Sequence, residues 1–352
     1  MNTILDSHFT YKGTRNYVKM SVESIAARDE FISKNDEKNV LEKQNCFLCD
    51  SEKFHLINEV DRYGFYYPTG MCTQCGNVQQ TKYYKESVLI DFYANFYRKI
   101  YGNSSSVQLF KSQKKYSGNK IFDFVAKYRN PKNVLEIGCG AGGILAVFKE
   151  NGANVTGLDF DDDYLNEARN HDINVIKGST EVLDIDQKFD VIILSHLLEH
   201  IVNPHDFLQD VKRFLSKDGL IYIEVPSINS VRDGAFHYDL LRYWQNAHTI
   251  HFTTKSLSLL CKSVGLENVF STNFIESCWK VSEIKKIITK EDLLSNLEHT
   301  QSVLHETEKI RKSLHGRITN LKAKMLPILS NFGLDVFAIK SFLRNMKVKI
   351  KL

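Results

Sequence analysis

The chain has little proline and no long apolar run. Only five of its 352 residues are proline and two are tryptophan. No stretch of 18 apolar residues occurs, so the sequence predicts no transmembrane helix. The first 20 residues contain no apolar run of signal-peptide length. We therefore expect a cytoplasmic protein whose thiols stay reduced.

A strong excess of charge of either sign is also missing. Lysine and arginine number 46 against 42 acidic residues, which leaves a formal net charge of +4. This excess is too small to indicate a nucleic-acid partner. Hydrophobic residues make up 43% and charged residues 25%, as in globular proteins that bury a sizeable core.

Four of the seven cysteines have the spacing of metal ligands. Cys46-x2-Cys49 and Cys72-x2-Cys75 are separated by 22 residues, and Gly76 relieves the turn after the second pair. Two such pairs can surround one tetrahedral ion, and four thiolates favour structural zinc or an iron–sulfur cluster. We predict a zinc-binding module with a hairpin-like stretch between the pairs. The other cysteines are expected to be ordinary small hydrophobes: Cys139, Cys261 and Cys278.

Residues 120–274 alternate between strand and helix patterns. The strand-type runs are NVLEIGC, NVTGLDF, INVIKG, FDVIILSH and LIYIEVP. The helical patterns between and after them are GILAVFKENG, DDYLNEARNHD, PHDFLQDVKRFLSKDG and FTTKSLSLLCKSVG, the last capped by Thr253 or Thr254. This alternation predicts a parallel, doubly wound α/β sheet.

A glycine-rich loop follows the first of these strands. Its glycines, Gly138, Gly140, Gly142 and Gly143, let the backbone turn tightly and approach a ligand at the next helix N-terminus. Asp159 ends the second strand, where a carboxylate can accept hydrogen bonds from both ribose hydroxyls. The letters G-C-G-A-G-G also satisfy the dinucleotide motif G-x-G-x-x-G, so the glycines alone do not decide the ligand.

With Glu136 inside the first strand, the segment V-L-E-I-G-C-G-A-G resembles motif I of class I S-adenosylmethionine-dependent methyltransferases. The run FDVIILSHLLEHIVNPHDFLQDVKRFLSKDGLIYIEVP is similar to the fourth strand, following helix and fifth strand of that family. The resemblance covers roughly residues 133–274. It implies a Rossmann-like methyltransferase domain over residues 129–280, with S-adenosylmethionine as cofactor.

The resemblance also implies a role for each cofactor residue. Gly138, Gly140 and Gly142 would line the methionine part, and Glu136 would orient the loop or the amino group. Asp159 would hold the ribose, and Phe160 would lie against the adenine. Residues near the adenine edge would be Ser179, Thr180 and Glu181. Ser195 and His196 would face the methionine and the methyl group.

A zinc module ahead of such a domain resembles sugar methyltransferases encoded with bacterial surface-glycan genes. The sugar C-methyltransferases of that group have a loop closer to G-S-N-D-G and a large second α/β domain, whereas only about 75 helical residues follow here. We therefore expect O-methylation of a sugar, either a nucleotide-sugar or a surface polysaccharide. A sugar C-methyltransferase, a small-molecule O-methyltransferase and a non-catalytic cofactor-binding scaffold remain as alternatives.

Two histidine-containing segments are candidates for acceptor chemistry, because a hydroxyl acceptor often needs a general base. In SHLLEH, His196 and His200 would share one face if the segment is helical. With Glu199 they also spell the inverted zincin pattern H-x-x-E-H, which lacks a protease context here. The predicted bases are His248, then His251 and His200. For each, a purely structural histidine is the alternative.

The second segment, residues 226–257, follows the fifth strand and is expected to cover the active site as the corresponding region of this family does. Aromatic faces can stack on a sugar ring, and polar tips can bind its hydroxyls. The predicted acceptor-binding residues are His237, Tyr238, Tyr243 and Trp244. The alternative is an ordinary folded lid.

The flanking segments are expected to be largely helical. Residues 1–42 include a helix over residues 21–33, residues 43–82 form the zinc module, and residues 83–128 form a helical connector. In residues 281–352 one helical face is predicted from Leu297, Leu304, Leu314, Ile318, Leu321 and Met325. This tail is expected to form a coiled coil, to dock a partner, or to pack on its own domain. Residues 340–352, with five basic and no acidic side chains, are a candidate contact with an anionic membrane.

Overall fold

The computed structural model describes residues 6–35, 40–102, 105–273, 275–282 and 287–331. The basic segment 340–352, a candidate membrane contact, lies outside these ranges. Within them, no helix combines the length and the apolar character that crossing a membrane requires.

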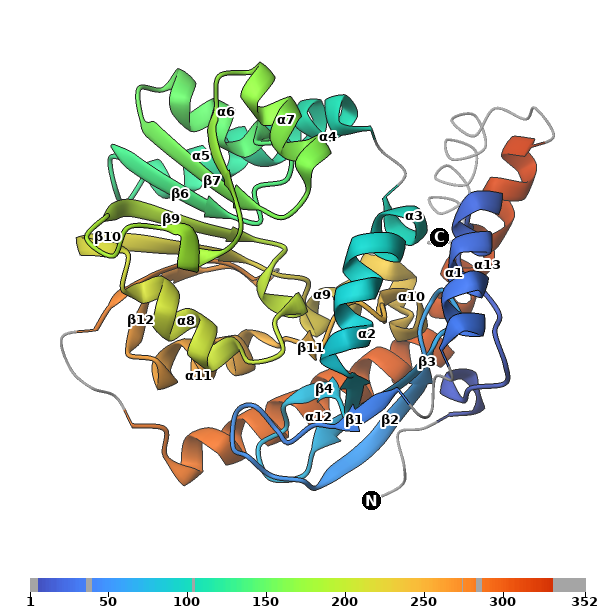
Figure 1. The fold of residues 1–352 in the computed structure, drawn as a ribbon. Coiled ribbons are helices and arrows are strands. Elements are labelled where there is room, and N and C mark those ends of the chain that lie inside the picture. Colours follow the sequence, from blue (N-terminus) through green and yellow to red (C-terminus); the bar gives the residue numbers. More distant parts are fainter. Residues whose placement is uncertain (1–5, 36–39, 103–104, 274, 283–286, 332–352) are drawn as a thin grey trace, which may run out of the picture.

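A seven-stranded sheet forms the centre of the fold (Figure 1). In spatial order its strands are β12 (Leu266–Ser271), β13 (Glu276–Val281), β10 (Leu215–Glu224), β9 (Phe189–Ser195), β6 (Asn133–Ile137), β7 (Asn154–Asp159) and β8 (Asn174–Lys177). Strands β6 to β10 are parallel. The chain runs from β6 outward to β8 and then returns to β9, so the strand order reverses between β6 and β9. The expected Rossmann-like, doubly wound sheet is confirmed.

Helices cover both faces of this sheet (Figure 1). One layer contains α5 (Asn119–Ala126), α6 (Gly143–Glu150) and α7 (Asp162–Asn170), and the other contains α8 (Pro204–Lys212) and α11 (Thr254–Ser263). Two apolar clusters of buried side chains fill the space between sheet and helices. As expected, Cys139, Cys261 and Cys278 are buried among them. Thr253 caps α11, one of the two predicted capping residues.

The sheet differs from the prediction in two places. β13 pairs antiparallel with both β10 and β12, and this antiparallel edge was not predicted. The predicted helix over residues 204–219 ends at Lys212, because Leu215 already pairs with Phe189 of β9. A register shift between Leu215 and Leu220 accommodates the K-D-G turn within β10.

The segment that precedes β6 in the sequence forms a small β-structure of four strands, one of which comes from a segment that follows β10. Its strands are β2 (Phe54–Val60), β3 (Tyr66–Cys72) and β4 (Val78–Gln80), and the fourth strand, β11 (Ile250–His251), comes from the insertion after β10. β11 pairs antiparallel with β4. The predicted hairpin between the cysteine pairs is confirmed as β2–β3. A separate pair joins β1 (Leu41–Lys43) to β5 (Lys82–Tyr84).

The first helix and the connector are helical, as predicted. α1 (Val22–Lys34) begins after Ser21, whose hydroxyl accepts a hydrogen bond from the backbone N–H of Ser24. Phe31 of α1 packs edge-on against four aromatic rings from the β-structure and the connector. The connector consists of α2 (Glu86–Asp91), the π-helical turn η2 (Phe92–Phe96), α3 (Tyr97–Tyr101), α4 (Ser106–Ser112) and the π-helical turn η3 (Gln113–Gly118).

The prediction that the apolar residues from Leu297 to Met325 share one helical face is wrong. Ser313, in extended backbone (φ −66°, ψ 163°), separates α12 (Lys290–Lys312) from α13 (Leu314–Asn331). Leu304 of α12 is buried among residues of the β-structure and the insertion. The four predicted face residues on α13 are exposed: Leu314, Ile318, Leu321 and Met325. α12 therefore packs on its own chain, and the break removes α13 from its helical register.

Candidate functional site

Four thiols converge beside the β2–β3 hairpin. Cys46 Sγ lies 3.4 Å from Cys75 Sγ, and Cys49 Sγ lies 3.6 Å from Cys72 Sγ. All four sulfur atoms lie within 4.8 Å of one another. In a tetrahedral zinc site, Zn–S bonds of about 2.3 Å place the sulfurs about 3.8 Å apart. The cluster therefore has the donor set and the size that one zinc ion requires.

Helix α12 closes this cysteine cluster from the other end of the sequence. The side-chain amide of Asn296 donates a hydrogen bond to the carbonyl of Cys75 at 2.7 Å. Gly76 has a φ of +74°, and a Cβ there would lie 2.4 Å from Cα of Leu297. The turn after the second cysteine pair thus needs glycine both for its backbone angle and for the approach of α12.

The glycine loop lies at the carboxyl end of β6, where the strand order reverses. Open α/β sheets bind ligands in the crevice at this point. Gly138, Gly140 and Gly142 all have positive φ angles, from +53° to +78°. A Cβ on Gly138 would lie 3.2 Å from Leu197, and one on Gly140 would lie 3.0 Å from Gln113. The loop therefore forms a cradle that side chains would fill.

Two carboxylates meet at this loop. Asp159, at the end of β7, accepts a hydrogen bond from the backbone N–H of Gly140 at 2.8 Å. Glu136 is 1% exposed, and its Oε2 has no hydrogen-bond partner within the described structure. Burial, aided by the charge of Asp159, raises the pKa of Glu136 well above its usual range. A ligand with hydrogen-bond donors or a positive charge would satisfy both groups.

The remaining predicted cofactor residues surround the same edge of the sheet. Phe160 is 67% exposed beside Asp159, so its ring is free to cover a flat group. Thr180 begins the 3-10 turn η4 (Thr180–Val182) after β8, with Glu181 accepting from the backbone N–H of Ser179. Ser195 ends β9 and lies 3.4 Å from Glu224 Oε2.

The sequence did not reveal three further residues at this edge. Gln113 donates to the carbonyl of Cys139 and accepts from the N–H of Gly143, so it bridges the glycine loop. Arg98 pairs with Asp161 at 2.8 Å and lies over the ring of Tyr164. Lys120 pairs with Glu224 at 2.8 Å. The connector and α5, which supply Gln113, Arg98 and Lys120, carry no motif, so only the folded chain brings these residues to this edge of the sheet.

The segment after β9 is not an α-helix. His196 adopts a left-handed φ of +53°, and only the three residues Leu198–His200 form a 3-10 turn, η5. His196 and His200 therefore do not share a helical face. Burial lowers the pKa of His196, but hydrogen bonding and charge from Glu199, together with Glu224, outweigh it and raise that pKa.

Glu199, His200 and His248 instead form a compact cluster. One ligand atom from each lies within 4.8 Å of the others. The rings of His200 and His248 are perpendicular, with centroids 4.9 Å apart. Burial lowers the pKa of both imidazoles, that of His248 well below its usual range. Both are therefore neutral near pH 7 and able to accept a proton or bind an ion. The structure thus brings together two of the three predicted bases.

The third predicted base, His251, lies in the core. It is fully buried, and its Nε2 lies 2.5 Å from the hydroxyl of Tyr67. Burial lowers the pKa of His251 to about 3. Trp244 and Tyr243 pack against its ring and are each 1% exposed. Their burial contradicts the expectation that these aromatic faces stack on an acceptor, because the lid uses them to pack on the β-structure.

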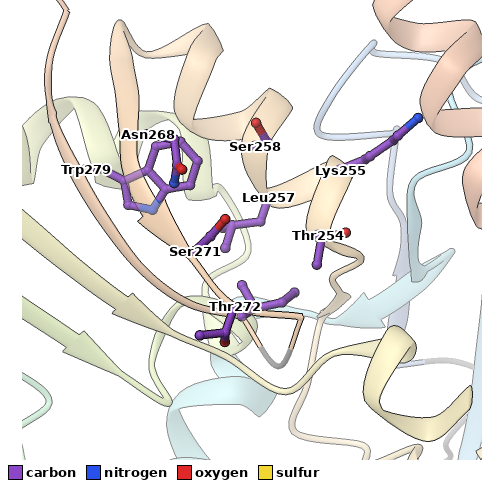
Figure 2. Close-up of a pocket in the computed structure, with 9 residues that line it drawn as sticks. Thr254, Lys255, Leu257, Ser258, Asn268, Ser271, Thr272 and Trp279 are labelled. Atoms are coloured by element: carbon purple, nitrogen blue, oxygen red, sulfur yellow. The ribbon is translucent and has the colours of Figure 1, made fainter. Parts of the chain in front are cut away.

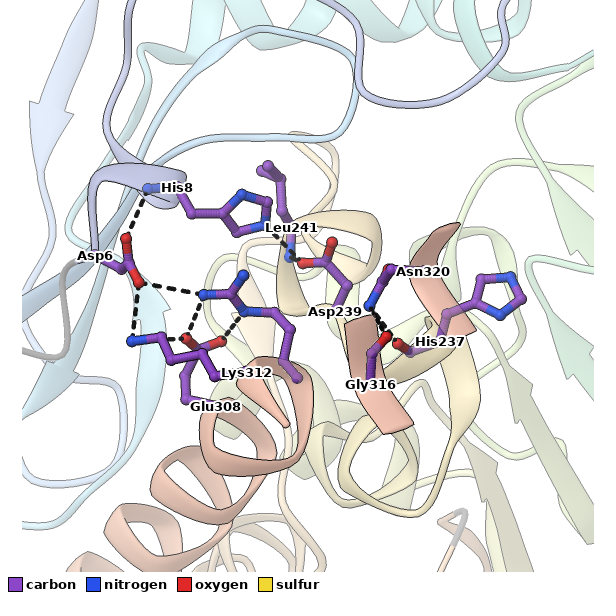
Figure 3. A network of polar contacts seen from close by, with 10 residues as sticks. Asp6, His8, His237, Asp239, Leu241, Glu308, Lys312, Gly316 and Asn320 are labelled. Atoms are coloured by element: carbon purple, nitrogen blue, oxygen red, sulfur yellow. Dashed lines mark hydrogen bonds and ion pairs between the residues drawn. The ribbon is translucent and has the colours of Figure 1, made fainter. Parts of the chain in front are cut away.

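His237 lies against α13 (Figure 3). Asn320 of α13 donates to the carbonyl of His237 at 3.0 Å, and the ring of Tyr238 meets that of His315 edge-on. Nearby, Asp239 pairs with His8 at 2.9 Å. These contacts place His237 and Tyr238 beside α13, and their role in acceptor binding stays a prediction.

A separate pocket of about 260 Å³ lies between α11 and the β12–β13 hairpin (Figure 2). Thr254, Lys255, Asn268 and Trp279 are among its lining residues. None of the predicted cofactor or acceptor residues lines it, so it is distinct from the glycine loop.

A family model described as a methyltransferase domain matches residues 111–270. These residues are a methyltransferase domain. The match contains the glycine loop, Asp159 and the Glu199 cluster, and it agrees with the Rossmann-like sheet described above. The methyltransferase domain accounts for less than half of the chain.

The curated relatives that match the domain are similar over about 100 residues. The ubiquinone biosynthesis O-methyltransferase of Glaesserella parasuis is 38% identical over 104 residues, 26% of this chain and 44% of that protein. The protein of the same name from Shewanella pealeana is 33% identical over 106 residues, 28% of this chain and 45% of its own. This chain thus spans less than half the length of these relatives.

Solved structures with a similar fold include two methyltransferases. An S-adenosylmethionine-dependent methyltransferase from Clostridium acetobutylicum is 13% identical, with a TM-score of 0.39, over 55% of this chain and 99% of that one. The plantazolicin methyltransferase BpumL, solved in complex with SAH, is 17% identical, with a TM-score of 0.41, over 62% and 89%.

Proposed function

We propose that the protein is an S-adenosylmethionine-dependent methyltransferase that methylates a hydroxyl oxygen. The observation that carries the proposal is the position of the Glu199 cluster after β9, next to the glycine loop after β6. These strands are neighbours, and the strand order reverses between them. A donor and an acceptor bound at these two strand ends would meet at the same edge of the sheet.

The residues of the loop fit the proposed cofactor. S-adenosylmethionine supplies a methyl group on a positively charged sulfur, already activated for transfer. The cradle of Gly138 and Gly140 accommodates its amino-acid end, and the unpaired Oε2 of Glu136 orients the amino group. Asp159 accepts hydrogen bonds from the ribose, and exposed Phe160 covers the adenine. Ser195 and His196 complete the methionine side.

The acceptor hydroxyl would lie against His200 and His248. Each imidazole has a ring nitrogen at this cluster that can take the hydroxyl proton as the oxygen attacks. His248 remains our first candidate for this base. His196, with its raised pKa and 57% exposed side chain, would lie on the solvent side.

A sugar hydroxyl remains the proposed acceptor, because the combination of a four-cysteine module with a methyltransferase domain resembles glycan-modifying proteins. A phenolic hydroxyl is the second candidate, because the curated relatives carry the name ubiquinone biosynthesis O-methyltransferase. A sugar carbon acceptor and a non-catalytic scaffold remain as further alternatives.

We also propose that the four cysteines bind structural zinc. The sulfur spacing and the all-thiolate donor set support this ion, and four thiolates leave no open position for chemistry. The ion would hold α12 against the sheet formed by β2, β3, β4 and β11. In that way it would fix the lid that carries His248.

Transfer of a labelled methyl group tests the function. Zinc-loaded full-length protein would be incubated with labelled S-adenosylmethionine and two acceptor panels, nucleotide-sugars and catechol-type phenols. Label on a sugar supports the preferred acceptor, and label on a phenol supports the second. His248→Ala should lose at least about tenfold in rate, while His205→Ala, an exposed histidine on α8, should not. Full activity of His248→Ala would reject His248 as base.

A further inference from the structure

Glu199, His200 and His248 are held together by the backbone as well as by their packing. The N–H of Thr249 donates to the carbonyl of Glu199 at 2.8 Å, and the Thr249 hydroxyl donates to the same carbonyl at 3.1 Å. These bonds fix the turn after β9 to the lid segment just before β11. The three side chains therefore converge as part of the fold.

Two polar atoms of this cluster are buried without a hydrogen-bond partner among the described residues. Glu199 is 1% exposed and His248 is 8% exposed. Over the described residues, neither Oε2 of Glu199 nor Nδ1 of His248 has a hydrogen-bond partner. A buried carboxylate oxygen without a hydrogen bond destabilises the folded state, even though Oε1 of the same group pairs with His196. A bound cation at this point would remove that destabilisation.

The neighbouring contacts orient the other ligand atoms. Nδ1 of His200 lies 3.0 Å from the carbonyl oxygen of Ala247 and must donate to it, which leaves the lone pair on Nε2. A backbone carbonyl on the far ring nitrogen is the usual support of a metal-binding histidine. Nδ1 of His196 lies 3.6 Å from Oε1 of Glu199, so the other carboxylate oxygen is the one left for a ligand.

We propose that Glu199, His200 and His248 bind a divalent metal ion such as Mn²⁺, Fe²⁺ or Zn²⁺. Two imidazoles and one carboxylate are a donor set that such ions accept, and three protein ligands leave coordination positions open. Resting on the proposed function, we assign these positions to oxygen atoms of the acceptor, best supplied by two adjacent hydroxyls. With the ion bound, His200 and His248 are ligands and not bases, and the ion would assist loss of the hydroxyl proton by lowering the pKa of the hydroxyl. The site is distinct from the four-cysteine cluster in both ligands and position in the chain.

Titration with Mn²⁺ tests the site, because thiolates disfavour this ion and the cysteine cluster can be filled beforehand with one zinc per chain. Loss of the free-Mn²⁺ electron paramagnetic resonance signal would report binding. We expect one Mn²⁺ per chain for the wild type and affinity at least about tenfold weaker for Glu199→Gln and His248→Ala. His205→Ala, an exposed histidine outside the cluster, should bind like the wild type.

Thermal unfolding provides a second readout that does not depend on activity. Mn²⁺ should raise the midpoint of zinc-loaded wild type and leave that of Glu199→Gln unchanged.

Calorimetry with S-adenosylmethionine separates the two proposals. Cofactor binding without Mn²⁺ binding would overturn the metal site and leave the methyltransferase proposal intact. Mn²⁺ binding without cofactor binding would support the metal site and reject the proposed function. Equal Mn²⁺ binding by wild type and Glu199→Gln would also overturn the metal site.

Discussion

Asn296 donates a hydrogen bond to the carbonyl of Cys75 at 2.7 Å, across 221 residues of sequence. The Asn296 side chain is fully buried, and its Oδ1 accepts a hydrogen bond from the hydroxyl of Thr253 at 3.4 Å. One side chain of α12 thus connects the cysteine cluster to the start of α11 in the methyltransferase domain. α12 is therefore a structural element of the core.

Asn296→Ala should lower the free energy of unfolding by about 1–3 kcal/mol, because a buried backbone carbonyl loses its donor. Denaturant unfolding of the zinc-loaded protein would measure this loss. Asn166→Ala is the matched control and should change little, because the exposed side chain of Asn166 accepts a hydrogen bond from another exposed side chain, that of Arg169. Equal stabilities of Asn296→Ala and the control would contradict the role of this contact.

Zinc analysis of the purified protein tests the cysteine cluster. Cys72→Ser should lose the ion held by the four thiolates and unfold at a lower temperature, since the ion stabilises the folded hairpin. Cys278→Ala changes a buried cysteine in β13 and should keep the zinc. Retention of the full zinc content in Cys72→Ser would show that the cluster is not the site.

Asp159→Asn should weaken S-adenosylmethionine binding at least about tenfold, which corresponds to about 1.4 kcal/mol. An amide has only one oxygen that can accept hydrogen bonds. The carboxylate accepts from the N–H of Gly140 and, in the proposed complex, would also accept from the ribose. Asp163→Asn, on the exposed first turn of α7, is the control. Unchanged affinity of Asp159→Asn in calorimetry would place the ribose elsewhere.

We expect the free energy of unfolding to depend on pH through the buried carboxyl group of Asp61. Its carboxylate accepts from the N–H groups of Tyr63 and Phe65 and, at 2.9 Å, from that of Asn246 in the lid. Burial raises the pKa of Asp61 to about 6, from 3.8 in an exposed chain. The folded state therefore holds this proton more tightly, so its contribution to stability falls as the pH rises between these two values.

Asp61→Asn isolates this effect because asparagine does not titrate. The difference in unfolding free energy, wild type minus variant, should fall by about 1 kcal/mol between pH 5 and pH 7.5. Denaturant unfolding at both pH values measures it. A difference that grows with pH would mean that the folded pKa of Asp61 is lowered instead.

The sequence predicted those parts of the site that are local. The glycine loop and Asp159 lie at the ends of single strands, and Cys46 and Cys49 lie three residues apart. Short apolar runs separated by helical patterns were sufficient to place β6 to β10, since most residues of β6, β7, β9 and β10 are buried.

Long-range pairing was not predictable in the same way. β11 has only two residues, which are too few to show the alternating hydrophobic pattern of a strand, so its pairing with β4 could not be predicted. Because this pairing buries His251 and Trp244 and positions His248, the lid residues could not be ranked from the sequence. The inverted zincin letters did mark Glu199 and His200, but the third member of the cluster came from 48 residues further along the chain.

The most direct test of the account is calorimetry of the zinc-loaded full chain with S-adenosylmethionine and, in parallel, with NAD. The glycine letters suit both ligands, whereas Glu136, the strand order and the family match favour the first. We predict binding of one S-adenosylmethionine per chain and no binding of NAD. Binding of NAD without binding of S-adenosylmethionine would contradict the central claim.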